Sequence, residues 1–304
     1  MHREDIVAFG YKEMEHSGFS WLATKEGMPF IIGVDDWSPR GIAVQKGWKS
    51  REKSLHEVYL ARDQEGMRYL VKIYPPKRNC PNFFSRRVNR AKNEFSKTLL
   101  ACKKEIQTVL PLAVAQGKED KRWGIIIYPF LDQAIPLERV YDCDNLSLLS
   151  IRERQLMEKT VGRLLRKFID EGAYPVDAHL DHFLIMKSGE ASVHVHYVDL
   201  ERIGFNSLTK SILKRRKLLK TLGRLIARLE WLRVSGFRIN RPSMMRMGRA
   251  FLEGKAFGIS GRRLRRAVIQ AAREFWYRRE FHTRGQYRSR SRGLPYSFDT
   301  RVLD

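Results

Sequence analysis

Cysteine is scarce in this 304-residue sequence, and its spacing argues against a cysteine-based framework. Cys80, Cys102 and Cys143 form no CxxC pair and are odd in number. This pattern disfavours a disulfide scaffold and a thiolate zinc site, and it fits a reducing compartment. No apolar run approaches the ~18 residues needed to span a bilayer. The first ten residues carry acids and lack the apolar segment of a secretory signal. We expect a cytoplasmic protein, either free or peripheral at the inner face of the cytoplasmic membrane.

Acidic residues are also few, and the deficit lies mainly in the last third of the chain. The sequence has 58 Lys plus Arg against 34 Asp plus Glu, a net charge of +24. Residues 201–304 hold 27 basic and 7 acidic residues, which gives +20. This excess predicts a polyanionic partner, although a solvated basic surface is the simpler alternative. We favour an anionic membrane or a phosphorylated glycolipid over nucleic acid, because the sequence has no zinc-finger or RNA-recognition signature.

The hydrophobic pattern predicts a strand-rich first part and a helix-rich second part. A capping box of Ser150 and Glu153 should start one long helix, and Gly172 should end it. The expected strands are 30–34, two around the turn "DQEG" within 56–74, "VLPLAVAQ", "WGIIIYPFL", and a hairpin of "FLIM" and "ASVHVHYVDL". The expected helices are 86–105, 150–172, 207–235, 241–252 and 260–281.

The stretch "PVDAHLDHFLIM", residues 175–186, concentrates two Asp and two His on a loop between a helix and a hairpin. Zinc and dinuclear hydrolases use such groups, so a hydrolase site is one interpretation. Its ligands would be Asp177, His179, Asp181 and His182. However, a loop that carries every ligand is unusual, and this interpretation leaves Lys72, Glu94 and Asp199 without a role.

Phosphoryl transfer accounts for more of these residues. The reaction needs a cation on the phosphates, carboxylates for a divalent metal, and a carboxylate that orients the attacking hydroxyl. Lys72 lies on an expected strand, and Glu94 lies on the next helix with Glu105 as a competitor for the same pairing. Three further candidates follow in order: Asp177 in the loop, His182 five residues later, and Asp199 after the hairpin. This order and spacing match the layout of protein kinases.

From about residue 56 to 250, the sequence resembles the lipopolysaccharide core kinases, kinase-like enzymes that phosphorylate Kdo or heptose sugars. The motifs are "NEFSKTLLACKKEIQTVLPLAVA", "IIIYPFLDQAIPLERVY", "DAHLDHFLI", "VDLERI" and "LTKSILKRRKLLKTLGRL". The resemblance implies that the backbone of segment 128–132, with Tyr128 and Phe130, holds the adenine of ATP. It also implies that His182 and Asp199 hold Mg or Mn.

The sequence departs from the kinase pattern before Lys72. No GxGxxG precedes this lysine, and the stretch "QKGWKS" offers a single glycine, Gly47. Pro175 stands where many kinases have a histidine, and His182 replaces the usual asparagine. Histidine is a softer ligand than asparagine, which favours manganese over magnesium.

These observations predict an α+β, bilobal protein-kinase-like fold. Its small, sheet-based first lobe with one helix spans 1–131, with an extension at 1–40. The larger helical lobe spans 132–282, and a basic tail at 283–304 is expected to be disordered. The expected activity is ATP-dependent phosphorylation of a sugar hydroxyl, most simply of the lipopolysaccharide core. The alternatives are a kinase for protein Ser/Thr or another small hydroxyl compound, and a catalytically dead scaffold that binds polyanions.

Overall fold

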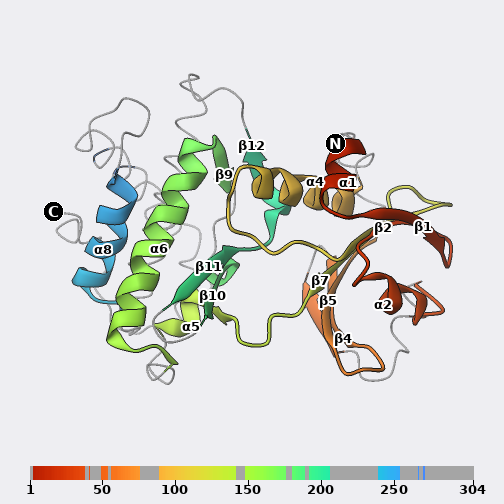
Figure 1. Ribbon diagram of the computed structural model, residues 1–304, viewed down its shortest axis with the longest axis horizontal. Coiled ribbons are helices and arrows are strands. Elements are labelled where there is room, and N and C mark those ends of the chain that lie inside the picture. The colour runs from red at the N-terminus through yellow and green to blue at the C-terminus, as the bar shows by residue number, and fades with distance from the viewer. Residues whose placement is uncertain are drawn as a thin grey trace, which may run out of the picture. The chain divides into compact units, whose positions relative to one another are not determined.

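The described residues of the computed structural model form two compact units (Figure 1). The first comprises Met1–Asp132 together with Asp199–Glu201, and the second comprises Gln133–Val198 with Arg202–Asp304. The structure describes residues 3–37, 41, 49–53, 56–75, 89–141, 148–175, 180–188, 192–205, 239–253, 266 and 270. None of the helices within these ranges has the length and apolarity to cross a membrane.

The first unit is built on a seven-stranded antiparallel sheet with the order β1-β2-β6-β7-β5-β4-β3. The predicted hairpin around "DQEG" is confirmed: the Met67 amide donates to Asp63 Oδ1 at 2.8 Å, and Gly66 has φ +85°. The strands are β1 Lys12–His16, β2 Phe19–Ala23, β3 Lys49–Lys53, β4 His56–Arg62, β5 Arg68–Tyr74, β6 Ala113–Gly117 and β7 Gly124–Pro129.

Each face of this sheet has its own helical cover. Helix α4, Arg90–Lys103, packs on one face, and helix α2, Met28–Ile32, packs on the other. Side chains alternate between the faces along each strand. In β7, Ile125 and Ile127 point towards α2, whereas Ile126 and Tyr128 point towards α4. The same alternation in β5 decides on which face Lys72 lies. A further short helix, α1, spans Arg3–Ala8.

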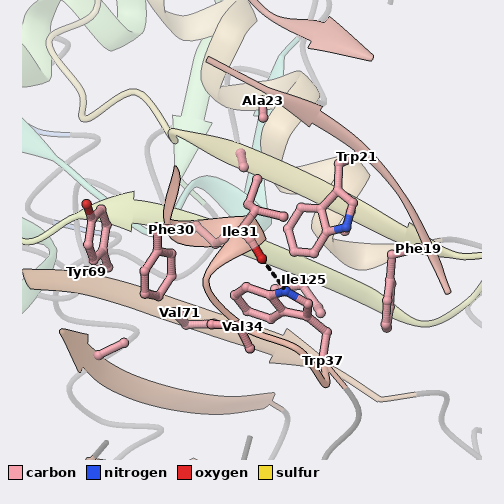
Figure 2. Close-up of a cluster of buried hydrophobic side chains, with 14 of the residues drawn as sticks. Phe19, Trp21, Ala23, Phe30, Ile31, Val34, Trp37, Tyr69, Val71 and Ile125 are labelled. Carbon is pink, nitrogen blue, oxygen red and sulfur yellow. Dashed lines mark hydrogen bonds between the residues drawn. The ribbon is translucent and has the colours of Figure 1, made fainter. Parts of the chain in front are cut away.

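The strand expected at 30–34 is wrong, because these residues belong to α2 and the turn after it. Pro29 stands in the first turn of the helix, where its fixed φ is suited to helical backbone. Phe30 and Ile31 pack among aromatic rings over the sheet (Figure 2), whereas Ile32 is exposed. Trp37 Nε1 donates to the Ile31 carbonyl at 3.1 Å, and the Phe30 ring stacks on Tyr69 at 4.1 Å.

An extension was expected at 1–40, and its described part, residues 3–37, supplies two strands and a cover to the sheet. β1 and β2 continue the sheet beyond β6. Trp21 of β2 meets the ring of Trp37 edge-on at 4.9 Å, and both side chains are almost completely buried (Figure 2). Aromatic pairs of this kind add to the stability gained from area burial. The N-terminal residues therefore complete the core of the first unit.

The second unit contains the long helix α6, Ile151–Asp170, with α8, Arg241–Leu252, packed beside it (Figure 1). The predicted capping box is confirmed. The Ser150 amide donates to Glu153 Oε2 at 2.6 Å, and the Glu153 amide donates to Ser150 Oγ at 3.2 Å. Gly172 has φ +66°, which suits the turn after the helix. The remaining elements are α5 Leu137–Val140, β8 Ile135–Pro136, β9 Ala173–Pro175, β10 Phe183–Lys187, β11 Val193–Tyr197 and β12 Ile203–Phe205.

The predicted hairpin of β10 and β11 is confirmed, and β8 pairs with the other side of β10. The helix expected at 241–252 is confirmed as α8, and the helix expected at 150–172 as α6. The helix expected at 207–235 and the tail at 283–304 lie outside the described residues. Within 260–281 only Arg266 and Gln270 are described, and both are helical.

Candidate active site

Strand β5 presents Lys72 on the face of the sheet that α4 covers. Val71 and Ile73 pack on the α2 face, so Lys72 and Tyr74 point the other way. β5 is hydrogen-bonded on both sides, to β4 and to β7. This central position leaves Lys72 only 7% exposed. A buried ammonium group requires negative partners close by, because burial without them costs several kcal/mol.

Helix α4 supplies the first partner of Lys72. Asn89 caps its start by accepting from the Lys92 amide at 3.0 Å. The buried positions recur at spacings of three and four residues, and Glu94 is one of them with 0% exposure. Glu105 lies beyond the end of α4 and is exposed. Glu94 lies on the apolar stripe of the helix and Glu105 does not. This feature of the sequence distinguishes Glu94 as the partner of Lys72.

Lys72 Nζ donates to Glu94 Oε1 at 2.8 Å and to Asp199 Oδ1 at 3.3 Å. The structure therefore pairs Lys72 with Glu94 and brings Asp199 from 127 residues away to the same ammonium group. Burial alone lowers the pKa of Lys72, but the charges of Glu94 and Asp199 outweigh it and hold the pKa above its ordinary value. Lys72 is a fixed cation at neutral pH.

Two tyrosines hold the Glu94 carboxylate from the sheet. The Tyr128 hydroxyl donates to Oε1 at 2.7 Å, and the Tyr74 hydroxyl donates to Oε2. Burial, followed by the charge of Glu94, raises the pKa of each phenol well above its ordinary value, so both remain donors. Sequence reasoning missed Tyr74. Its place two residues after Lys72 on the same strand face was the signal that could have identified it.

Three carboxylates meet beside Lys72: those of Glu94, Asp199 and Glu201, with ligand oxygens within 4.8 Å of one another. Glu94 already accepts from Lys72 and two phenols, and Glu201 accepts two hydrogen bonds from the Arg90 guanidinium. Asp199 makes the longer 3.3 Å contact, and 25% of its side chain is exposed. Carboxylate oxygen suits Mg and Mn, so Asp199 is the member of this group that fits a metal ligand.

The segment expected to hold adenine begins at the end of β7. The Tyr128 side chain faces α4 and belongs to the Glu94 group, so any contact of this residue with a base would be made by its backbone. The Phe130 amide donates to the Arg68 carbonyl at 3.0 Å. The Arg68 guanidinium lies 4.7 Å from the centre of the Phe130 ring and pairs with Asp132. Arg68 thus fixes residues 130–132 against the end of the sheet.

The remaining predicted site residues belong to the second unit. His182 ends a short 3₁₀ turn at Leu180–His182, and its carbonyl accepts from the Val198 amide at 2.8 Å. Its ring lies edge-on to Tyr197 at 5.9 Å, and its Nε2 lies 3.9 Å from Asp181 Oδ1. Asp177 and His179 lie outside the described residues, as do Gly47 and the two residues between β3 and β4.

No protein-family model matches the chain, and no curated protein sequence matches it significantly. Solved structures do match. The structure titled "WaaP in complex with acyl carrier protein" has a TM-score of 0.52 and 19% identity, over 79% of this chain and 89% of that one. The Rio2 kinase–ADP/Mg2+–phosphoaspartate complex from Chaetomium thermophilum has a TM-score of 0.42 and 12% identity, over 88% and 82%.

The likeness to WaaP confirms, at the level of the fold, the resemblance expected from the sequence. The sheet with Lys72 on a central strand and Glu94 on the covering helix agrees with that likeness. The chain therefore has a protein-kinase-like, α+β fold.

Proposed function

We propose that the protein transfers the γ-phosphoryl group of ATP to a hydroxyl group. The observation that carries the proposal is the contact of one buried ammonium group, Lys72 Nζ, with both Glu94 and Asp199. Phosphoryl transfer depends on positioning and on electrostatic stabilisation more than on covalent help from the protein. A cation held rigidly between two carboxylates, on a kinase-like sheet, is suited to that task.

Each site residue has a defined role in this proposal. Lys72 would bind the phosphates of ATP, and Glu94 would orient Lys72. Asp199 and His182 would hold a divalent metal, Mg or Mn, which when bound neutralises phosphate charge. Asp177 would orient the acceptor hydroxyl. The backbone of segment 128–132 would contact adenine, with Phe130 fixed by Arg68.

We further propose that the acceptor is a sugar hydroxyl of a lipopolysaccharide core. Support comes from the sequence motifs and from the fold shared with WaaP. The +20 charge of residues 201–304 would hold the protein peripherally on an anionic membrane, at the inner face of the cytoplasmic membrane, or on the phosphorylated glycolipid itself. An anionic glycolipid that carries the acceptor sugar is complementary in charge to a basic protein surface.

The first experiment asks whether the protein binds ATP at all. Its thermal unfolding would be measured with ATP alone, with ATP and MgCl2, and with ATP and MnCl2. A rise of the midpoint that needs the metal is expected, because ligands that bind only the folded state stabilise it. Asp199→Asn should reduce this metal-dependent rise while the fold persists, since asparagine also tolerates the positive φ of +63° found at position 199. No shift under any condition would favour the dead scaffold.

The second experiment identifies the reaction. Radiolabelled ATP would be incubated with the protein and with lipopolysaccharide stripped of its core phosphates, a protein Ser/Thr substrate, or no acceptor. Transfer to the lipopolysaccharide alone is expected, and Asp177→Asn should reduce it by about 10²-fold or more, the usual contribution of a positioned acid–base group. ATP binding should stay unchanged in that variant. Transfer to protein instead would refute the proposed acceptor, and full turnover of the variant would remove Asp177 from the mechanism.

A further inference from the structure

Glu201, two residues after Asp199, is bound tightly to the start of helix α4. Arg90 Nε donates to Glu201 Oε1 at 2.6 Å, and Arg90 Nη2 donates to Oε2 at 2.8 Å. Lys97, two turns further along α4, donates to the Glu201 carbonyl at 2.5 Å. These bonds join residues more than 100 positions apart in the sequence. Two-pronged arginine–carboxylate pairs are among the strongest and most directional hydrogen-bonded contacts in proteins.

The place of Arg90 at the start of α4 does not by itself stabilise the helix. Arg90 is the first residue of the helix, where a positive charge opposes the helix dipole, and the first turn contains no acidic residue. The carboxylate of Glu201 supplies the missing negative charge from a distant segment. The pair is only 17% and 14% exposed, so solvent screens it less than a surface pair. Arg90 also lies 4.8 Å from the centre of the Tyr74 ring, and this tyrosine binds Glu94.

The segment that Glu201 anchors has an uncommon backbone. Asp199 has φ +63°, a left-handed conformation that few residues other than glycine adopt and that persists only when surrounding contacts enforce it. Lys72 contacts the Asp199 side chain, and Arg90 and Lys97 hold the chain two residues later. Both anchors lie in the same compact unit as Asp199.

We infer that Arg90, Lys97 and Glu201 act as positioning residues, which form a clamp that holds Asp199 in its metal-binding conformation before any ligand arrives. The role of the clamp in metal binding rests on the proposed function. The existence of the clamp does not. Glu201 is proposed to act through the backbone, since its carboxylate binds Arg90 and its carbonyl accepts from Lys97.

The clamp is testable in the ligand-free protein. Hydrogen exchange would be followed by mass spectrometry in peptides that cover residues 198–203. Arg90→Gln should speed exchange there by about tenfold or more, since a charge-assisted hydrogen bond contributes at least that factor to an equilibrium. Arg90→Lys should give a smaller increase, because it keeps the charge and loses the two-pronged geometry.

The matched control is Arg122→Gln. Arg122 makes the same two-pronged contact in the same unit, with Asp120, at 2.8 and 2.6 Å, but this contact joins residues only two positions apart and does not tie distant segments together. The Arg122→Gln variant should leave hydrogen exchange in residues 198–203 unchanged. The double variant Arg90→Glu with Glu201→Arg restores the charge pair, so it should return exchange towards the wild-type rate. That rescue keeps the test decisive if a single variant folds poorly.

A second readout connects the clamp to the metal. Arg90→Gln should weaken nucleotide binding in the presence of MgCl2 or MnCl2 by about tenfold, and should leave metal-free binding within about twofold. Exchange at 198–203 that is unchanged in Arg90→Gln would overturn the clamp, whatever the protein binds. Equal weakening with and without metal would overturn its link to Asp199. Wild-type protein that binds no nucleotide would instead refute the proposed function, while the exchange result still decides the clamp.

Discussion

The buried pair of Lys72 and Glu94 predicts a strong thermodynamic coupling that is independent of any enzymatic activity. Glu94 has no exposed surface and accepts hydrogen bonds from Lys72, Tyr74 and Tyr128. Lys72→Met leaves this carboxylate with two phenol donors and removes its cationic donor. Removing one partner of a buried ion pair costs about 3–5 kcal/mol, because the other charge stays buried without compensation.

Glu94→Gln should cost less, about 1–3 kcal/mol, the range for a buried polar group that loses part of its hydrogen bonding. The amide oxygen of glutamine can still accept from Lys72 and Tyr128, which share Oε1, while its NH2 group faces a Tyr74 hydroxyl able to accept. Lys72 also keeps Asp199 at 3.3 Å. The double variant removes both charges, so its loss should fall short of the sum by at least about 1 kcal/mol.

Urea unfolding would be followed by tryptophan fluorescence, because Trp21 and Trp37 are buried in the same unit as the pair. The free energy of unfolding comes from linear extrapolation for the wild type, the two single variants and the double variant. Losses that add to within about 0.5 kcal/mol would show that the two side chains do not depend on each other. That result would refute both the coupling and the idea that Glu94 orients Lys72.

Three further predictions concern packing and ionisation. A Cβ on Gly162 of α6 would lie 2.3 Å from the Met247 carbonyl of α8, so Gly162→Ala should lower the thermal midpoint; Gly248→Ala, with open space around it, should not. Burial raises the pKa of the Cys102 thiol to about 11, so at pH 8 it holds roughly a hundredfold less thiolate than a thiol of pKa 9. With the other cysteines replaced by serine, DTNB should therefore react more slowly by about tenfold or more, since the higher pKa makes the remaining thiolate more nucleophilic. Burial and the charge of Glu94 raise the pKa of Tyr74, so its contribution to stability is present below pH 10 and is lost progressively above it. The free energy of unfolding should therefore decline between pH 10 and 11. Tyr74→Phe should make that decline shallower, by up to about 1.4 kcal/mol per pH unit. A full thermal midpoint in Gly162→Ala, fast labelling of Cys102, or an unchanged alkaline slope would contradict the respective argument.

Local chemistry made much of the fold predictable. The capping box of Ser150 and Glu153, the glycine at 172 and the turn at 63–66 each depend on residues close together in the chain. Lys72 and Glu94 were predicted for the same reason, since each lies on an element whose period is visible in the sequence. The strand expected at 30–34 failed because a five-residue apolar run has no period long enough to distinguish a strand from a helix.

The contacts that complete the site were not predictable in this way. Arg90 and Glu201 are 111 residues apart, and neither stands in a pattern that names its partner. The position of Tyr74 puts it on the strand face of Lys72, but nothing in the sequence shows that its hydroxyl binds Glu94. The contribution of residues 12–37 to the sheet also depends on long-range pairing, of β2 with β6, which short-range propensity does not specify.

The first unit is discontinuous along the chain, since Asp199–Glu201 belongs to it although Gln133–Val198 does not. This has a consequence during protein synthesis. Ribosomes add about 5–20 residues per second, so the roughly 70 residues between Asp132 and Glu201 take about 3–14 s to appear. Throughout that interval the sheet and α4 can assemble, but Glu201 is not yet available to pair with Arg90, and Asp199 is not yet available to Lys72. The nascent first unit should therefore pass through an intermediate with surplus positive charge around Lys72 and Arg90, and it should reach its final stability only when Asp199–Glu201 has been synthesised.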